Sequence, residues 1–117
     1  MTMALTMYGI RNCETVKKAR AWLESKGIDY AFHDYKSAGA DRKLLEAWSA
    51  EVGWEALLNK SGMTFRKLPA KETANLDARK AISLMIAHPS AIKRPIVAGR
   101  GNLLVGFRPE AYAREFG

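Results

Sequence analysis

Residues 4–33 read ALTMYGIRNCETVKKARAWLESKGIDYAFH, and the spacing of their apolar residues predicts a β-α-β unit. Residues 4–8 are short and largely apolar and lead into Gly9, as a buried strand does where it enters a loop. In residues 14–26 the apolar residues recur every three or four positions, which is typical of an amphipathic helix. The positions predicted to face the core are Val16, Ala19 and Leu23.

Gly27 and the residues after it predict the end of this helix and a second strand. Glycine readily adopts the left-handed conformation with which many helices end. Ile28, Tyr30 and Phe32 then alternate with Asp29, Ala31 and His33, which is the period of a strand with one face on the core. Because a helix joins the two strands, we expect them to lie parallel.

The middle of the chain carries helical patterns. We predict a turn at residues 37–40, followed by a helix that Asp41 caps. Residues 54–58 indicate a further helical turn, and residues 77–87 a longer helix. The positions predicted to face inward are Leu44, Leu45, Trp48 and Val52 in the first helix and Ala78, Ala81, Ile82 and Met85 in the last.

The end of the chain returns to strand patterns. Residues 95–98 and 103–107 are apolar runs joined by Gly99-Arg100-Gly101-Asn102, a typical hairpin sequence. Pro109 suits the first turn of a last helix, where Ala113 and Phe116 are predicted to pack inward. The order β-α-β, helical block, β-β-α predicts an α/β protein with a thioredoxin-like fold, a mixed four-stranded sheet and a helical insertion at about residues 41–90.

The composition indicates one small folded domain that spans residues 1–117. Apolar residues make up 48% of the chain and charged residues 26%, an ordinary globular mixture. The N-terminal sequence lacks the features of a signal peptide, and no apolar run has the length of a membrane span, so we expect a soluble cytoplasmic protein. A single cysteine allows neither an internal disulfide nor a multi-thiolate metal site, and we expect no metal and no bound cofactor.

The net charge of +7 means that the protein attracts anions, such as glutathione, oxyanions or acidic protein surfaces. The basic residues are spread along the chain, so a solvated basic surface explains the charge equally well. The sequence has no recognised DNA- or RNA-binding motif. We therefore expect neither a nucleic-acid partner nor a membrane partner.

Cys13 stands between the first predicted strand and the first predicted helix. Backbone N–H groups at a helix start have no acceptor within the helix, and together with the helix dipole they favour a thiolate there. Arg11 and Lys17 add positive charge nearby, whereas Glu14 opposes them. The residues alone leave a second interpretation open, an inert core cysteine, because free cysteine is among the most buried residue types.

Three separated motifs resemble a known family. Tyr8-Gly9-Ile10-Arg11-Asn12-Cys13 begins the match, and Lys93-Arg94-Pro95-Ile96-Val97 with Phe107-Arg108-Pro109-Glu110 completes it. Over essentially its whole length the chain resembles the ArsC/Spx family of the thioredoxin superfamily, most closely its arsenate reductase-like YffB-type members. The resemblance implies that Cys13 is the reactive thiol and catalytic residue.

The resemblance also implies a set of anion-binding residues. In arsenate reductases of this family, three arginines surround the oxyanion at the thiol, and the matching residues here are Arg66, Arg94 and Arg108. Arginine suits this task because its planar guanidinium donates paired hydrogen bonds and keeps its charge. Pro95 matches the proline that thioredoxin-like folds hold in cis opposite the thiol, although a trans proline at an edge strand fits its spacing equally well.

Four residues near the thiol complete the predicted site. Arg11 and Asn12 are expected to help bind substrate or glutathione, and Thr15 and Lys17 to support the helix N-terminus. His33 and His88 have no further ligand-type residues at metal-binding spacing, so we interpret both as structural.

The chain also departs from the arsenate reductases at three positions. Those enzymes typically carry His where this chain has Gly9, Asn where it has Ile10, and a hydroxyl residue where it has Val16. The expected consequence is weaker oxyanion binding. Val16 also stands where Spx regulators often have the second cysteine of a Cys-x-x-Cys motif, so a redox switch within this motif is excluded.

The resemblance and the single thiol together predict a glutathione-dependent thiol-disulfide reductase. Without a second cysteine, an external thiol must resolve the enzyme-bound intermediate, so glutathione is the expected reductant and glutaredoxin a further expected partner. The substrate would be a disulfide or an oxyanion. Two alternatives stay open: an arsenate reductase coupled to glutathione or glutaredoxin, and a non-catalytic Spx-like regulator that binds RNA polymerase.

Overall fold

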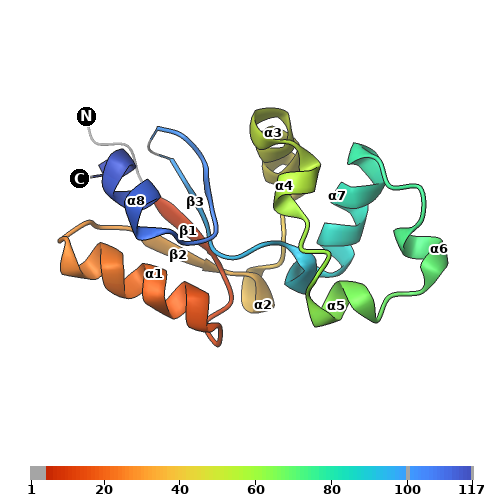
Figure 1. The fold of residues 1–117 in the computed structure, drawn as a ribbon, viewed down its shortest axis with the longest axis horizontal. Helices are drawn as coiled ribbons and strands as arrows, with labels where there is room; N and C mark the ends of the chain where they lie inside the picture. The colour runs from red at the N-terminus through yellow and green to blue at the C-terminus, as the bar shows by residue number, and fades with distance from the viewer. Residues whose placement is uncertain (1–4, 100, 117) are drawn as a thin grey trace. The chain divides into compact units, whose positions relative to one another are not determined.

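The computed structural model describes residues 5–99 and 101–116 (Figure 1). The described chain divides into two compact units: residues 5–38, 94–99 and 101–116 form one, and Gly39–Lys93 form the other. The second unit corresponds to the predicted helical insertion at about residues 41–90. Two residues of predicted elements, Ala4 in the first strand and Arg100 in the hairpin, lie outside the described residues.

The first unit is built on a mixed four-stranded sheet. Its strands are β1 (Thr6–Gly9), β2 (Ala31–Asp34), β3 (Ile96–Ala98) and β4 (Leu104–Val105), in the order β2-β1-β3-β4. β1 is parallel to β2 and antiparallel to β3, and β3 is antiparallel to β4. The predicted fold class, strand pairing and C-terminal hairpin are therefore confirmed.

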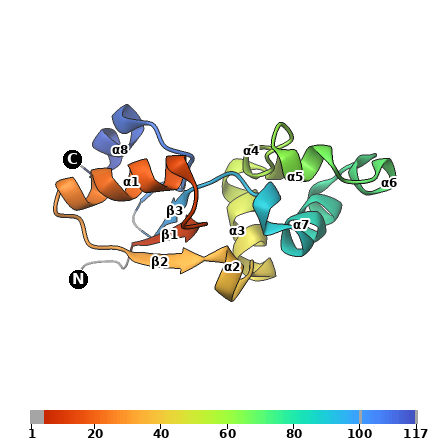
Figure 2. The ribbon, with the colours of Figure 1, turned by 90° about the horizontal axis from the view of Figure 1, so that it is seen from below.

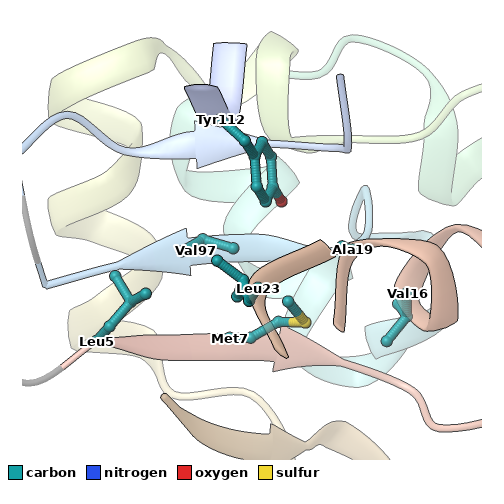
Figure 3. Packing of buried hydrophobic residues seen from close by; sticks show 7 residues of the cluster. All are labelled: Leu5, Met7, Val16, Ala19, Leu23, Val97 and Tyr112. Atoms are coloured by element: carbon teal, nitrogen blue, oxygen red, sulfur yellow. The ribbon is translucent and has the colours of Figure 1, made fainter. Parts of the chain in front are cut away.

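Two helices, α1 (Glu14–Ser25) and α8 (Pro109–Phe116), lie together on one face of this sheet (Figure 2). Gly27 has φ +69°, which confirms the predicted left-handed end of α1. The buried side chains between the sheet and the two helices form one cluster (Figure 3). Its members are Leu5, Met7, Val16, Ala19, Leu23, Val97 and Tyr112, and they include all three residues of α1 that the periodicity predicts.

One inward position predicted for α8 is wrong. Ala113 is exposed, and Tyr112 takes the buried position. Tyr112 and Phe116 are four residues apart and so share one helix face, from which both rings contact Trp22, at centroid distances of 5.6 and 6.5 Å. The large aromatic surface outweighs the small alanine in setting which face of the helix is buried.

The second strand begins later than its alternating pattern predicts. Its ladder starts where Thr6 pairs with Ala31, because β1 itself begins at Thr6. Ile28 and Tyr30 precede the strand but still pack against the core cluster, so the predicted face is confirmed. The predicted turn at residues 37–40 is partly wrong, since a single helical turn, α2 (Tyr35–Ala38), occupies its first half.

The second unit is helical, as predicted. Its main helices are α3 (Arg42–Val52) and α7 (Ala78–Ala87), capped by Asp41 and Asp77, whose carboxylates accept hydrogen bonds from Leu44 N–H (3.0 Å) and Lys80 N–H (2.8 Å). Short helices fill the rest: α4 (Trp54–Leu57), α5 (Met63–Arg66), α6 (Ala70–Thr73) and the 3₁₀ turn η1 (Pro89–Ala91).

Three details of this unit differ from the prediction. Ala78 is exposed although its position in the pattern predicts burial, because it opens the first turn of α7, and Leu84 is buried instead. α5 and α6 had no counterpart in the sequence analysis. Each is a single turn, too short to show a helical period.

Within the part of the chain that the structure describes, no helix is both long enough and apolar enough to cross a membrane.

Candidate functional site

The register of the sheet brings four segments of the chain to one of its ends. β1 and β2 are parallel, so their last residues lie at the same end. β3 is antiparallel to β1 and therefore starts at that end, and β4, antiparallel to β3, finishes there. The residues that this topology gathers there are Cys13, Asp34, Arg94, Pro95 and Arg108.

Cys13 is the N-cap residue of α1. Its backbone is extended (φ −137°, ψ 124°), and its carbonyl accepts the Lys17 N–H at 2.9 Å, the first bond of the helix. The side chain is half-buried against the core cluster and makes no capping hydrogen bond to the described residues. Cys13 thus stands at the first turn of α1, where backbone N–H groups have no acceptor within the helix.

The two cations predicted to assist the thiolate have carboxylate partners. Arg11 Nε lies 3.6 Å from Asp34 Oδ2, and its guanidinium carbon lies 5.1 Å from the centroid of the Phe32 ring. Lys17 Nζ lies 3.6 Å from Glu14 Oε1 in an exposed pair. Both charges are therefore partly neutralised by neighbouring carboxylates.

Gly9 lies in close contact with Val16. A Cβ added at Gly9 would lie 2.9 Å from Val16 Cγ2, closer than real Cβ atoms approach other carbons. Both positions are among the departures from the arsenate reductases. Any larger side chain at position 9 thus requires the valine to move, so the two departures are linked by packing.

The Arg94–Pro95 peptide bond is cis, as the resemblance implies. The Pro95 carbonyl accepts the Gly106 N–H at 2.7 Å, and the Gly106 carbonyl accepts the Tyr112 hydroxyl at 2.9 Å. These two bonds tie the start of β3 to the segment after β4. Arg108 follows this segment, is exposed, and accepts the first backbone bonds of α8 at its carbonyl.

Tyr35, which the sequence analysis did not single out, also lies at this end of the sheet. It follows β2 and is only 4% exposed, and its hydroxyl has no hydrogen-bond partner among the described residues. Burial raises the pKa of Tyr35, the adjacent Tyr8 raises it further, and the positive charge of Arg94 acts in the opposite direction. The sequence signal that could have identified Tyr35 is its position, since it is an aromatic residue directly after a strand that ends beside the cysteine loop.

The remaining predicted residues belong to the second unit or are exposed in the first. Arg66 belongs to the second unit, at the end of α5, where it lines a small hollow with Met63 and Lys67. Asn12 and Thr15 are exposed, on either side of Cys13. Across residues 5–99 and 101–116, no group of three or more His, Cys, Asp or Glu side chains is placed to hold a metal ion.

The fold and the site define a class: a thioredoxin-like α/β protein with one half-buried cysteine at the start of its first helix. The model of the ArsC family matches residues 8–115. The chain belongs to the ArsC family.

Known relatives agree with this assignment. The solved structure of a YffB protein is 51% identical, covers 97% of this chain and 100% of its own, and superposes with a TM-score of 0.95. An arsenate reductase (ArsC) related protein from Brucella melitensis is 52% identical, with 99% and 97% of the two chains covered and a TM-score of 0.75. The global transcriptional regulator Spx of Streptococcus pyogenes is 27% identical over 91% of this chain and 80% of its own.

Proposed function

We propose that this protein is a glutathione-dependent thiol-disulfide reductase of the cytoplasm, with Cys13 as its nucleophile. The observation that carries the proposal is the position of the only cysteine in the sequence, half-buried at the N-cap of α1. The half-buried position leaves part of the sulfur accessible, and a nucleophile at a helix start lies near backbone N–H groups that have no acceptor within the helix. Similarity to an arsenate reductase-related protein supports thiol chemistry in this family.

The reaction has two balanced exchange steps. The Cys13 thiolate attacks the glutathione sulfur of a mixed disulfide; a new disulfide forms between Cys13 and glutathione, and the substrate thiolate leaves and takes up a proton. A second glutathione, as its thiolate, then attacks the glutathione sulfur bound to Cys13. Oxidised glutathione leaves and the Cys13 thiolate is restored. An external thiol is needed because the sequence has no second cysteine.

The basic residues at the same end of the sheet support a carboxylate-bearing thiol. Glutathione carries two carboxylates. Arg94 lies just before β3 and Arg108 lies between β4 and α8, both at the end of the sheet that carries the cysteine loop. Guanidinium groups bind carboxylates in paired hydrogen bonds. The net charge of +7 also increases the encounter rate with such an anion.

Arsenate reduction is the second enzymatic candidate, and the contact between Gly9 and Val16 counts against it. The family's arsenate reductases place an imidazole at the position of Gly9, but a side chain there collides with Val16. Val16 also supplies no hydroxyl donor to an oxyanion. The contact between Gly9 and Val16 therefore lacks both groups that would help bind arsenate, the imidazole and the hydroxyl.

A regulatory role is the candidate from a different class, favoured by the similarity to Spx. Such a module would act through contact with RNA polymerase and would not need the thiol. A protein with Cys13→Ser that co-purifies with polymerase as well as the parent protein does would favour it over both enzymes.

The test is a coupled assay with glutathione, glutathione reductase and NADPH, run in parallel with a glutathione mixed disulfide and with arsenate. The proposal predicts turnover of the mixed disulfide that Cys13→Ser removes. Turnover of arsenate alone would reverse the ranking of the two enzymatic candidates. If neither substrate is turned over, the regulatory role is the remaining candidate.

A further inference from the structure

A second group of charged residues lies beside the site, on the outer side of β2. An open hollow of about 570 Å³ lies between α1, the turn that follows it and β2. Its lining includes two basic, two acidic and two aromatic residues: Arg11, Arg20, Glu24, Asp29, Tyr30 and Phe32. Of these residues, only Arg11 is also predicted to bind substrate or glutathione, and it lies two residues before Cys13.

The two arginines are held on one aromatic ring. The guanidinium carbons of Arg11 and Arg20 lie 5.1 and 4.4 Å from the centroid of Phe32. Each uses its Nε for an internal contact: Arg11 Nε lies 3.6 Å from Asp34, and Arg20 Nε donates to the Tyr30 hydroxyl at 2.9 Å. The stacking and these contacts restrict both guanidinium groups, although Arg11 less than Arg20 because the Arg11 side chain is 64% exposed. A ligand that binds them therefore loses less side-chain entropy than it would on free arginines.

The outer nitrogens of both guanidinium groups are the donors available to a ligand. Among the described residues, no hydrogen bond or ion pair involves the Nη atoms of Arg11 or Arg20. Of the acids that line the hollow, Glu24 already accepts the Tyr30 hydroxyl at 2.6 Å, and Asp29 is exposed and makes no ion pair with either arginine among the described residues. A carboxylate is the partner that such paired donors bind best among protein side chains.

The adjoining edge of the sheet is open. β2 is the terminal strand of the sheet, and in the described chain it pairs with β1 alone. The Ala31 N–H points toward β1, where it donates to the Leu5 carbonyl at 2.8 Å, so by alternation the backbone groups of Phe32 point outward. An extended peptide can pair with such an edge, with its side chains read by neighbouring pockets.

We propose that Arg11 and Arg20, fixed on Phe32, bind an acidic side chain of an extended peptide segment that pairs with the open edge of β2. The occupant is a protein substrate with an acidic residue near its disulfide, and this part of the inference rests on the proposed function. Arg11 connects the two sites, because it lines the hollow and lies two residues before Cys13. The substrate class is then glutathionylated proteins with acidic segments.

An alternative role for the same two arginines is purely structural. Charged residues on an edge strand can keep other chains from pairing with it. In that case, removing a guanidinium would promote self-association and would not change the preference among peptides. The experiment separates the two roles by measuring both.

The test measures binding with peptides that cannot react. Fluorescent peptides of identical sequence, with serine in place of cysteine, carry Glu, Gln or Lys at one position beside it, and their affinity is measured by anisotropy at low and high salt. Arg20→Gln is the test variant, since Arg20 lies on α1 away from the thiol. Arg114→Gln is the matched control, because Arg114 is an exposed arginine of the same unit and its removal changes the net charge equally.

We expect the parent protein and Arg114→Gln to bind the Glu peptide about fivefold more tightly than the Gln peptide, with a smaller ratio at high salt. In Arg20→Gln the ratio falls to about one. Because the ratio compares two peptides on one protein, a reduced folded fraction cancels from it. Equal ratios in all three proteins, no binding of any peptide, or self-association of Arg20→Gln with an unchanged ratio would each overturn the proposal. Loss of turnover in the coupled assay would instead overturn the proposed function and leave this ratio as measured.

Discussion

The start of α1 differs from the starts of α3 and α7 in its capping residue. Asp41 and Asp77 each cap their helix with a side-chain carboxylate, through hydrogen bonds of 3.0 and 2.8 Å. Cys13 occupies the same position of α1, and its side chain makes no capping bond to the described residues. Of the three longest described helices, two thus begin with a capping carboxylate and the third, α1, does not.

Under the proposed function, the start of α1 serves chemistry, whereas the starts of α3 and α7 serve stability. A good N-cap contributes about 1 kcal/mol, and cysteine is not among the residues that supply it. Places where a chain departs from its own local rules are often functional sites. Substitutions at the starts of α1, α3 and α7 should therefore affect activity at α1 and stability at α3 and α7.

The largest expected effect is on turnover. Cys13→Ser should lower glutathione-dependent reduction of a mixed disulfide by roughly a thousandfold or more, because the hydroxyl is not a nucleophile in this exchange. Asp41→Ala, at the equivalent position of α3, serves as the control and should keep the turnover of its folded fraction. Equal activity of the parent protein and Cys13→Ser in the coupled assay would remove the distinction between the helix starts.

The second effect is on stability. Asp41→Ala and Asp77→Ala should each lower the free energy of unfolding by about 1 kcal/mol, since each removes a partner of a backbone N–H. Urea titration followed by circular dichroism measures the change. Asp41→Asn and Asp77→Asn keep an acceptor and should lose less. Unchanged unfolding midpoints for both alanine variants would show that the carboxylates do not cap in solution.

The smallest effect has the opposite sign. Cys13→Ser should raise the free energy of unfolding by about 0.5 kcal/mol, because serine can cap α1 while losing only part of the packing of the half-buried sulfur. The same urea titration applies, with Cys13→Ala as the comparison that cannot cap. If serine is no more stable than alanine at this position, capping does not limit the stability of α1.

The predictable parts of the fold are those in which a local pattern decides the structure. The period of Val16, Ala19 and Leu23 and the glycine at position 27 are enough to define α1 and its end, since both depend on neighbouring residues only. The single-turn helices α5 and α6 carry no such period. Their structure depends on packing within the second unit, which no short window of sequence contains.

The candidate site shows the same limit. Its residues could be named from motifs, but the partner of Arg11 could not, because Asp34 is distant in sequence and becomes a neighbour only through the parallel pairing of β1 and β2. The contact that leaves no room beside Gly9 arises from the packing of α1 on β1. Side-chain pairings of this kind join residues that are far apart in the sequence, so no local pattern predicts them.

The proposed function requires the Cys13 sulfur at the start of α1 to act as a nucleophile. This is tested most directly by treating the protein with a glutathione mixed disulfide in the absence of free glutathione and measuring the mass of the protein. We predict that one glutathione adds to Cys13, and that iodoacetamide no longer alkylates this residue after the reaction. An unchanged mass would contradict the proposed function.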